Sequence, residues 1–209
     1  MAHILITSGP TRQYLDPVRY LTNASSGRMG AALAEAAIQS GHDVIVVSGP
    51  VDVEYPKKAK VVSAISTEDM LKACLKIFPK CEGLIAAAAP CDYRPVSVAK
   101  HKIRKTGATL KMQLVETADV VASLASVKDK QWMVAFALET KDAHMRALQK
   151  LEQKSCDLVV VNGPEAVHAL NTSVEILDKT GDVIAAFAGS KLSVGKKIFR
   201  VIQQRLIQK

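Results

Sequence analysis

Apolar runs alternate with amphipathic stretches along most of the chain. The apolar runs are short and continuous, which predicts strands buried on both faces of a sheet. They lie at Ile4–Thr7, Asp43–Ser48, Val61–Ala64, Gly83–Ala88, Met133–Leu138 and Asp157–Val161. The stretches between them have a helical period, which predicts helices at Arg28–Ser40, Thr67–Ile77, Ala118–Val127 and Asp142–Lys154.

Local signals mark two of the predicted helix ends. Gly41 fits the C-terminal cap of the first helix, and Ser66 fits the N-terminal cap of the second. Strands that alternate with helices in this way form parallel sheets with helices on both faces. We therefore expect an α/β protein with a Rossmann-like three-layer fold and a mostly parallel sheet.

Two segments depart from this alternation. Residues 90–116 are polar, basic and interrupted by prolines, with a short alternating stretch at 109–115, so we expect an antiparallel arm or flap there. Residues 173–187 predict a C-terminal hairpin that turns at Thr180–Gly181. A basic helix at about 191–207 closes the chain. Without an internal repeat, linker or low-complexity tract, residues 1–209 are predicted to form a single domain.

The composition fits an intracellular globular protein. The 209 residues suffice for one large α/β domain with a core. No apolar run approaches the length of a bilayer span, and the N-terminus lacks the features of a signal peptide, so a cytoplasmic protein without membrane contact is expected. Cysteines 74, 81, 91 and 156 show no CxxC pairing or matching histidine spacing, which predicts reduced thiols.

The net charge of +8 allows nucleic acid, a membrane surface or small acidic molecules as partners. Nucleic-acid binders without a dedicated motif usually interleave basic residues with aromatic ones, on which bases stack. The basic runs at 100–105 and 193–200 have almost no aromatic neighbours. Phosphorylated small molecules therefore fit at least as well, and we do not expect nucleic acid as a partner.

The segment between the first strand and the first helix, residues 9–30, is unusually long. Connections in α/β units usually take only a few residues. Ligands of open α/β sheets bind at the carboxyl ends of the strands, where this segment lies. It carries six polar side chains able to contact a ligand: Arg12, Asp16, Arg19, Asn23, Ser25 and Ser26.

Two familiar nucleotide-binding motifs are absent from the sequence. Gly9 is followed by Pro10-Thr11-Arg12, so the GxGxxG fingerprint is missing, and the second strand ends without the acid that would bind an adenosine ribose. No tyrosine is followed four residues later by lysine, so the catalytic pair of short-chain dehydrogenases is missing as well. The phosphate-binding P-loop, GxxxxGK[ST], does not occur either. A nicotinamide enzyme and a P-loop protein are both disfavoured.

Two interpretations of Ser25-Ser26-Gly27 stay open on the residues alone. The free N–H groups and the dipole at the start of the following helix favour an anion. An ordinary helix N-cap is the commoner use of such residues. Similarly, the run that contains Lys102, Arg104 and Lys105 could bind phosphate or form a solvated face.

Five sequence blocks resemble the phosphopantothenate–cysteine ligase family, the phosphopantothenoylcysteine synthetases of coenzyme A biosynthesis. They occur in family order over roughly residues 4–175. The blocks are DPVRYLTNASSGRMGAALAEAA at 16–37, DYRP at 92–95, KIRK at 102–105, AFALET at 135–140 and KLEQKSCDLVVVN at 150–162.

The resemblance implies formation of an amide between 4′-phosphopantothenate and L-cysteine. In the bacterial family, CTP activates the carboxylate, pyrophosphate leaves, and cysteine displaces CMP from the acyl-cytidylate. Mg²⁺ would accompany the nucleotide, but its ligands cannot be named and the choice between CTP and ATP stays open. The family also implies a homodimer, with the 90–116 arm as a candidate dimer element and lid.

The resemblance also assigns site residues. Three residues match family residues at the catalytic centre: Asn23, Arg19 and Lys102. By this resemblance, Asn23 acts on the oxyanion of the second half-reaction, and Lys102 is located on a mobile flap. The nucleotide and its phosphates are assigned to Gly9, Thr11, Ser25, Ser26, Gly27, Ala86, Ala87, Ala88, Ala118, Asp119, Val120, Val121, Asp92, Phe136, Lys150 and Lys154.

The chain departs from the family pattern at Pro10, Cys91 and Gly163. Cys91 is interpreted as a small buried thiol rather than a nucleophile, since no histidine is placed to act as its base. Many bacterial relatives carry an N-terminal flavin-dependent decarboxylase; none is seen in this sequence, so no flavin is expected and a separate polypeptide would supply that activity. The alternative function is a catalytically silent protein that binds a nucleotide or phosphometabolite.

Overall fold

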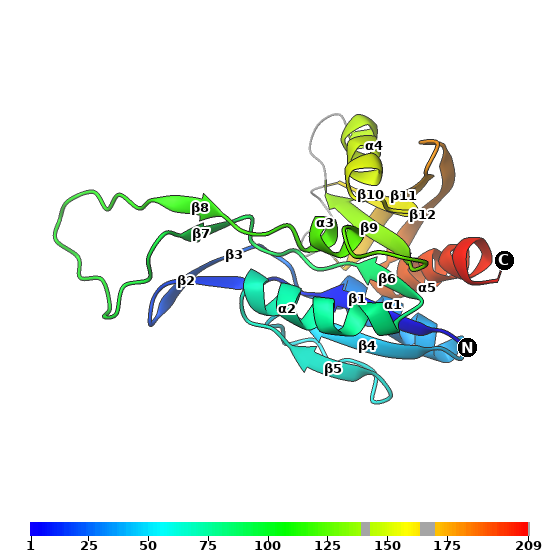
Figure 1. The fold of residues 1–209 in the computed structure, drawn as a ribbon, viewed down its shortest axis with the longest axis horizontal. Coiled ribbons are helices and arrows are strands. Elements are labelled where there is room, and N and C mark those ends of the chain that lie inside the picture. Colours follow the sequence, from blue (N-terminus) through cyan, green and yellow to red (C-terminus); the bar gives the residue numbers. More distant parts are fainter. Residues whose placement is uncertain (139–142, 164–169, 209) are drawn as a thin grey trace.

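A computed structural model describes residues 1–138, 143–163 and 170–208 of the chain (Figure 1). Its centre is an eight-stranded sheet with the order β12-β11-β10-β9-β6-β1-β4-β5. These strands are β1 His3–Ser8, β4 Asp43–Ser48, β5 Lys60–Ser63, β6 Gly83–Ala86, β9 Trp132–Leu138, β10 Leu158–Asn162, β11 Asn171–Asp178 and β12 Val183–Ser190.

The strands from β10 to β5 in this order run parallel, and β11 and β12 add antiparallel pairs at the other edge. The six predicted strands are therefore confirmed, although β6 ends at Ala86 rather than at Ala88. The predicted hairpin is also confirmed. Its turn contains Gly181 at φ 87, a left-handed conformation that glycine adopts without steric penalty.

Helices cover both faces of the sheet, as predicted for three layers. Helices α1 (Arg28–Gln39) and α5 (Lys191–Ile202) pack with Ile4 and Ile6 in one core. The second core, around Leu5, lies under helices α2 (Thr67–Ile77), α3 (Val120–Ala125) and α4 (Ala143–Gln153). Alternate residues of β1 enter opposite cores because successive side chains of a strand point to opposite faces. A short 3₁₀ turn at Phe78–Lys80 follows α2, and a π-helical turn at Gln203–Ile207 follows α5.

The sequence predicts the start of α2 and the end of α1. Ser66 caps α2: its hydroxyl accepts the Asp69 N–H at 3.0 Å, while the Asp69 carboxylate accepts the Ser66 N–H at 3.0 Å. Helix α1 ends at Gln39, and Gly41 follows at φ 84, so the glycine lies just beyond the cap.

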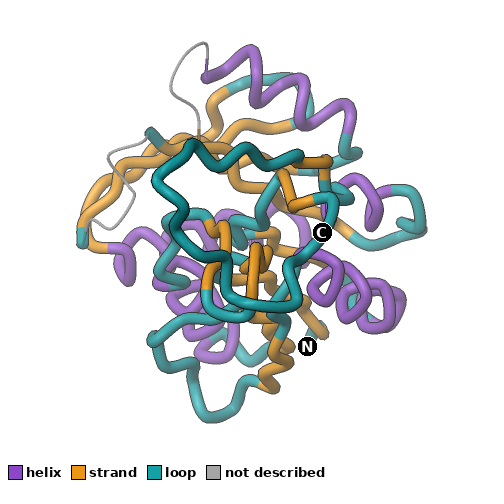
Figure 2. Tube along the Cα trace, turned by 90° about the vertical axis from the view of Figure 1, so that its left-hand side faces the viewer, coloured by secondary structure: helices purple, strands orange, loops and turns teal. Residues whose placement is uncertain are grey.

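Two small antiparallel ribbons project from the carboxyl ends of the parallel strands. The predicted arm at 90–116 contains β7 (Tyr93–Pro95) paired with β8 (Leu114–Glu116) and extends away from the sheet (Figure 1). Viewed from the arm side, it lies in front of the sheet (Figure 2). Beside it, the long segment after β1 forms a hairpin of β2 (Arg12–Asp16) and β3 (Arg19–Thr22), which the sequence analysis did not predict.

The four cysteines are buried and unpaired, which confirms the predicted thiols. Burial raises the pKa of Cys74 to about 12 and that of Cys81 to about 11, so both remain protonated at neutral pH. Within residues 1–138, 143–163 and 170–208, every helix is too short or too polar to cross a bilayer.

Candidate functional site

Helix α1 begins against the end of β1. At Gly30 an added Cβ would lie 2.1 Å from the Ser8 Oγ, so only glycine allows this approach. The Ser8 hydroxyl donates to the Gly27 carbonyl at 3.2 Å and ties the helix start to the strand. The N-cap is Gly27 at φ 74, so α1 begins within the Ser25-Ser26-Gly27 stretch as that interpretation expected, but neither serine side chain caps the helix.

The β2–β3 hairpin explains the length of the segment after β1. At its tip the buried Asp16 accepts the N–H groups of Val18 and Arg19 through Oδ1, at 2.9 and 2.8 Å. Its Oδ2 accepts the Arg19 guanidinium at 2.6 Å and the Ile103 N–H at 3.1 Å. The guanidinium also donates to the Ile103 carbonyl at 3.0 Å, so Asp16 and Arg19 together hold the arm beside Lys102.

Asp16 is held as a carboxylate by this network. Burial opposes its ionisation, but hydrogen bonds from the Val18, Ile103 and Arg19 N–H groups and the Arg19 charge outweigh burial and lower its pKa. The Asp16-Pro17 dipeptide is a turn signal that could have revealed the hairpin.

We call the larger of two adjoining pockets at this edge of the sheet the nucleotide-sized pocket. Its volume is about 700 Å³, within the range typical of small-molecule sites. It lies between the end of β6, the base of the arm and the start of α3. Its lining includes Asn23, Ala24, Ala86, Ala88, Ala89, Pro90, Cys91, Asp92, Tyr93, Glu116, Thr117, Ala118, Asp119, Val120, Val121, Phe136 and Lys154.

Two of the residues that line the nucleotide-sized pocket form an ion pair. The Lys154 ammonium lies 2.6 Å from Asp119, whose other oxygen accepts the Ala122 N–H and caps α3. Burial acts to raise the pKa of Asp119, but the Ala122 N–H and Lys154 hold it below its ordinary value. Asn23 also lines this pocket, and its amide donates to the Pro90 carbonyl at 2.8 Å. The pocket therefore presents a cation, carboxylates and an amide donor.

We call the smaller of the two adjoining pockets the cationic pocket. Its volume is about 160 Å³. It lies between the start of α1, the end of β10 and the start of α5. It shares Ala24, Ala88, Ala89 and Phe136 with the nucleotide-sized pocket, so the two adjoin. Its other lining residues are Ser25, Ser26, Gly27, Arg28, Met29, Gly30, Ala87, Asn162, Thr172, Val174 and Lys191.

The structure brings most of the predicted site residues to these two pockets. Ten line the nucleotide-sized pocket and six line the cationic pocket, with Ala88 and Phe136 in both. Five are not among the lining residues: Gly9, Thr11, Arg19, Lys102 and Lys150. Lys102 is exposed on the arm, and the side chain of Lys150 in α4 lies outside the described residues.

Thr11 and Cys91 form a buried support beneath the site. The Thr11 hydroxyl lies 2.9 Å from that of Thr67 and accepts the Cys91 N–H at 2.8 Å. The Cys91 thiol lies 3.3 Å from the Thr11 carbonyl. Burial, ahead of any other influence, raises the pKa of Cys91, which agrees with the interpretation of a structural thiol.

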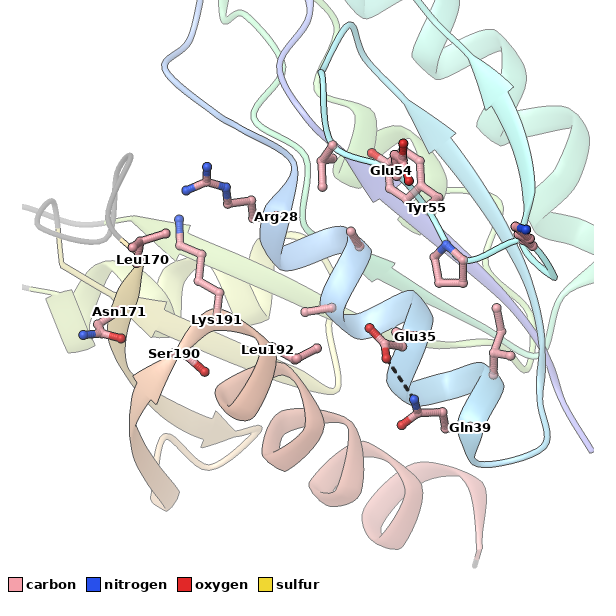
Figure 3. Close-up of a pocket in the computed structure, with 16 residues that line it drawn as sticks. Arg28, Glu35, Gln39, Glu54, Tyr55, Leu170, Asn171, Ser190, Lys191 and Leu192 are labelled. Carbon is pink, nitrogen blue, oxygen red and sulfur yellow. Dashed lines mark hydrogen bonds between the residues drawn. The ribbon is translucent and has the colours of Figure 1, made fainter.

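Sequence reasoning did not assign Arg28, Thr172 and Lys191 to the site. The last two come from the C-terminal hairpin and helix, where neither spacing nor motif distinguishes them from ordinary surface residues. Arg28 and Lys191 also border an open groove of about 920 Å³ between α1, α5 and the loop at 53–57 (Figure 3).

This arrangement defines a class: a Rossmann-like α/β domain with two adjoining pockets, a candidate ligand site, at the carboxyl ends of its strands. The chain belongs to the family described as the DNA/pantothenate metabolism flavoprotein C-terminal domain, which matches residues 1–206 and confirms the family expected from the sequence blocks.

Known relatives agree with this assignment. The coenzyme A biosynthesis bifunctional protein CoaBC of Bacillus subtilis is 42% identical over 165 residues, which cover 78% of this chain and 41% of that protein. The crystal structure of the C-terminal domain of a bifunctional protein CoaBC is 34% identical, with TM-score 0.83 and coverage of 99% of this chain and 96% of that one. A Cab2 mutant in complex with phosphopantothenate-cysteine shares the fold, with TM-score 0.78, 18% identity and coverage of 99% and 86%. The chain spans less than half the length of the bifunctional relatives.

Proposed function

We propose that this domain is a ligase of coenzyme A biosynthesis that joins L-cysteine to 4′-phosphopantothenate after a nucleotide, CTP, has activated the carboxylate. The observation that carries the proposal is that two pockets adjoin near Asn23, which lines the larger one. One has room for a nucleotide, and the other is lined by cations. A substrate with a phosphate at one end and a carboxylate at the other would span them. Its carboxylate would then meet the nucleotide phosphates near Asn23.

The chemistry needs positioned charge rather than a covalent nucleophile. A carboxylate is a poor acylating agent because its leaving group would be oxide. Transfer of a nucleotidyl group to it, with release of pyrophosphate, builds charge on phosphate oxygens that cations and N–H donors stabilise. Lys154 supplies a cation within the nucleotide-sized pocket. Lys102 would supply another if the arm closed over the pocket.

Asn23 is proposed to act when cysteine attacks the acyl-nucleotidylate. Its amide N–H groups would donate to the oxyanion of that step, in exchange for the Pro90 carbonyl that accepts one of them here. Arg19 acts indirectly, since its guanidinium is engaged by Asp16 and the arm. Arg19 is therefore proposed to position the segment that carries Lys102.

Mg²⁺ is proposed to accompany the nucleotide. Asp92 and Glu116 bring carboxylates to the nucleotide-sized pocket, and carboxylates are the protein ligands that Mg²⁺ prefers. When bound, the ion would neutralise phosphate charge. Asp92 and Glu116 would orient it directly or through its water ligands.

A homodimer is also proposed, through the arm. Several apolar side chains of the arm are exposed, which is unusual for a segment in free solution. They are Val96, Val98, Leu110, Met112, Leu114 and Val115. A molar mass of twice the chain mass in light scattering would support this assembly, and a monomeric mass at micromolar concentration would argue against it.

The experiment that tests the proposed function measures pyrophosphate release from the purified protein with 4′-phosphopantothenate, cysteine and Mg²⁺, using CTP and ATP in parallel. We expect release that requires phosphopantothenate, followed by CMP formation when cysteine is added. Faster pyrophosphate release with ATP than with CTP would show that ATP is the nucleotide substrate. Absence of release with both nucleotides would favour the catalytically silent binder.

A further inference from the structure

The peptide unit between Pro90 and Cys91 connects the site to the core beneath it. Its carbonyl, on Pro90, accepts the Asn23 side-chain amide at 2.8 Å. Its N–H, on Cys91, donates to the Thr11 hydroxyl at 2.8 Å. Because the unit is planar and trans, its N–H and C=O point in opposite directions, so fixing one fixes the other. The Thr11 hydroxyl therefore sets the direction of the carbonyl that Asn23 contacts.

Thr67, the first residue of α2, closes a ring of hydrogen bonds around Cys91. Its hydroxyl donates to the Cys91 carbonyl at 3.1 Å and lies 2.9 Å from the Thr11 hydroxyl. A threonine hydroxyl has a single proton. Since Thr67 gives its proton to Cys91, the Thr11 hydroxyl is the donor to Thr67. We call this closed cycle, from the Cys91 N–H through Thr11 and Thr67 to the Cys91 carbonyl, the hydroxyl ring.

The hydroxyl ring is enclosed in the protein. The exposed fractions of Thr11, Thr67 and Cys91 are 0%, 1% and 4%. Water cannot replace a lost partner at such a depth, and hydrogen bonds in a chain strengthen one another in a low dielectric. Without the Thr67 hydroxyl, the Thr11 proton would lose its acceptor. The Thr11 hydroxyl could then rotate away from the Cys91 N–H and release the peptide unit.

Thr117 attaches the same segment to the far side of the arm. Its hydroxyl donates to the Cys91 carbonyl at 2.6 Å, and its N–H donates to the Asp92 carbonyl at 2.9 Å. These two bonds do not involve Thr67. A change at Thr67 should therefore open the hydroxyl ring and leave the base of the arm attached to the fold.

We propose that Thr67, through Thr11 and the Pro90–Cys91 peptide unit, positions Asn23 for amide formation. In the described part of the chain neither threonine lines the two pockets, so both are positioning residues. This inference rests on the proposed function, in which Asn23 donates to the oxyanion formed when cysteine attacks. The Pro90 carbonyl holds the Asn23 amide before that step. The hydroxyl ring should accordingly affect the second half-reaction and not the activation of the carboxylate.

The test compares wild type with Thr67→Val, Thr67→Ser and the control Thr180→Val. Valine replaces the hydroxyl by a methyl group of similar shape, whereas serine keeps the hydroxyl. Thr180→Val removes an exposed hydroxyl that contacts Asp178 and Asp182 in the C-terminal hairpin.

Thr67→Val is expected to slow amide formation about tenfold, the effect of losing about one hydrogen bond, while pyrophosphate release stays near the wild-type rate. Acyl-nucleotidylate should accumulate. Thr67→Ser should recover most of the rate, and Thr180→Val should match wild type. Equal slowing of both half-reactions, or no slowing of either, would overturn the proposal.

A double-mutant cycle determines whether Thr67 acts through Asn23. Thr67→Val is combined with Asn23→Ala, and the residual rate of amide formation is measured in single turnovers. If the threonine acts only through the asparagine, the double variant should be no slower than Asn23→Ala alone. A further tenfold loss, about the same as in the presence of Asn23, would show independent effects and overturn the proposal.

Nuclear magnetic resonance separates this proposal from the proposed function. The side-chain amide signals of Asn23, identified by their loss in Asn23→Ala, should shift in Thr67→Val and stay in place in Thr180→Val, even if the wild type forms no product. Unshifted signals in Thr67→Val would refute the coupling. In the wild type, the Cys91 amide should exchange with deuterium more slowly than that of Gly107 in the exposed arm. Equal exchange would refute the hydroxyl ring without the need for any variant.

Discussion

Gly30 is the position at which one added methyl group should perturb both the fold and the site. A Cβ at Gly30 would lie 2.1 Å from the Ser8 Oγ and 2.5 Å from the Ser8 Cβ, whereas ordinary contacts begin near 3.4 Å. Both atoms belong to a buried residue whose hydroxyl already bonds the Gly27 carbonyl. Gly30→Ala must therefore displace the start of α1 from β1 by about 1 Å, because a packed interior cannot absorb the overlap.

The expected magnitude follows from two opposing effects. Overpacking of this kind destabilises a protein by about 1–3 kcal/mol. Alanine in place of glycine inside a helix stabilises the folded state by about 1 kcal/mol because its helix propensity is higher. We therefore expect the free energy of unfolding to fall by about 0–2 kcal/mol. A shift of about 1 Å at the site can reduce turnover about a hundredfold, so activity should fall more than stability.

Urea unfolding followed by circular dichroism measures the stability, and product formation measures the activity. The control is Ser8→Gly, alone and combined with Gly30→Ala. It removes both atoms that the new methyl group would overlap and leaves a contact of 3.3 Å to the Ser8 Cα. The double variant should be more active than Gly30→Ala. A Gly30→Ala protein as stable and as active as wild type would refute the reasoning.

Three further predictions concern the hairpin and the arm. Asn23→Ala should release pyrophosphate at nearly the wild-type rate but block amide formation, so that acyl-nucleotidylate accumulates; equal loss of both steps would remove Asn23 from this role. Lys102→Gln should slow pyrophosphate release about tenfold or more, since it removes a charged contact to phosphate, and unchanged release would exclude the arm lysine. Asp16→Asn should lower the free energy of unfolding at neutral pH. Because the folded-state pKa of Asp16 lies below its ordinary 3.8, its contribution is present above that value and lost as the pH falls through the lower one. The difference between wild type and Asp16→Asn should therefore shrink in urea titrations toward acid pH, and a constant difference would contradict the assignment.

The sequence alone determined the layers of this protein. Short continuous apolar runs such as Val44–Val47 are typical of strands covered on both faces, and the helical periods between them favour a parallel α/β sheet. Ser66 and Gly181 marked a helix start and a hairpin turn because their effects are local. Long motif blocks such as residues 16–37 were specific enough to identify the family.

Only the tertiary structure decided how distant segments form the site. The β2–β3 hairpin was missed because much of what holds it comes from elsewhere: Ile65 accepts the Arg12 N–H, and Ile103 contacts Asp16. Ser25 and Ser26 resembled capping residues, yet the contact of α1 with Ser8 leaves Gly27 at the cap. Lys191 and Thr172 join Arg28 only because the sheet order brings the C-terminal hairpin beside β10 and packs α5 against α1. Their meeting in one pocket depends on contacts between distant segments, which no local pattern in the sequence records.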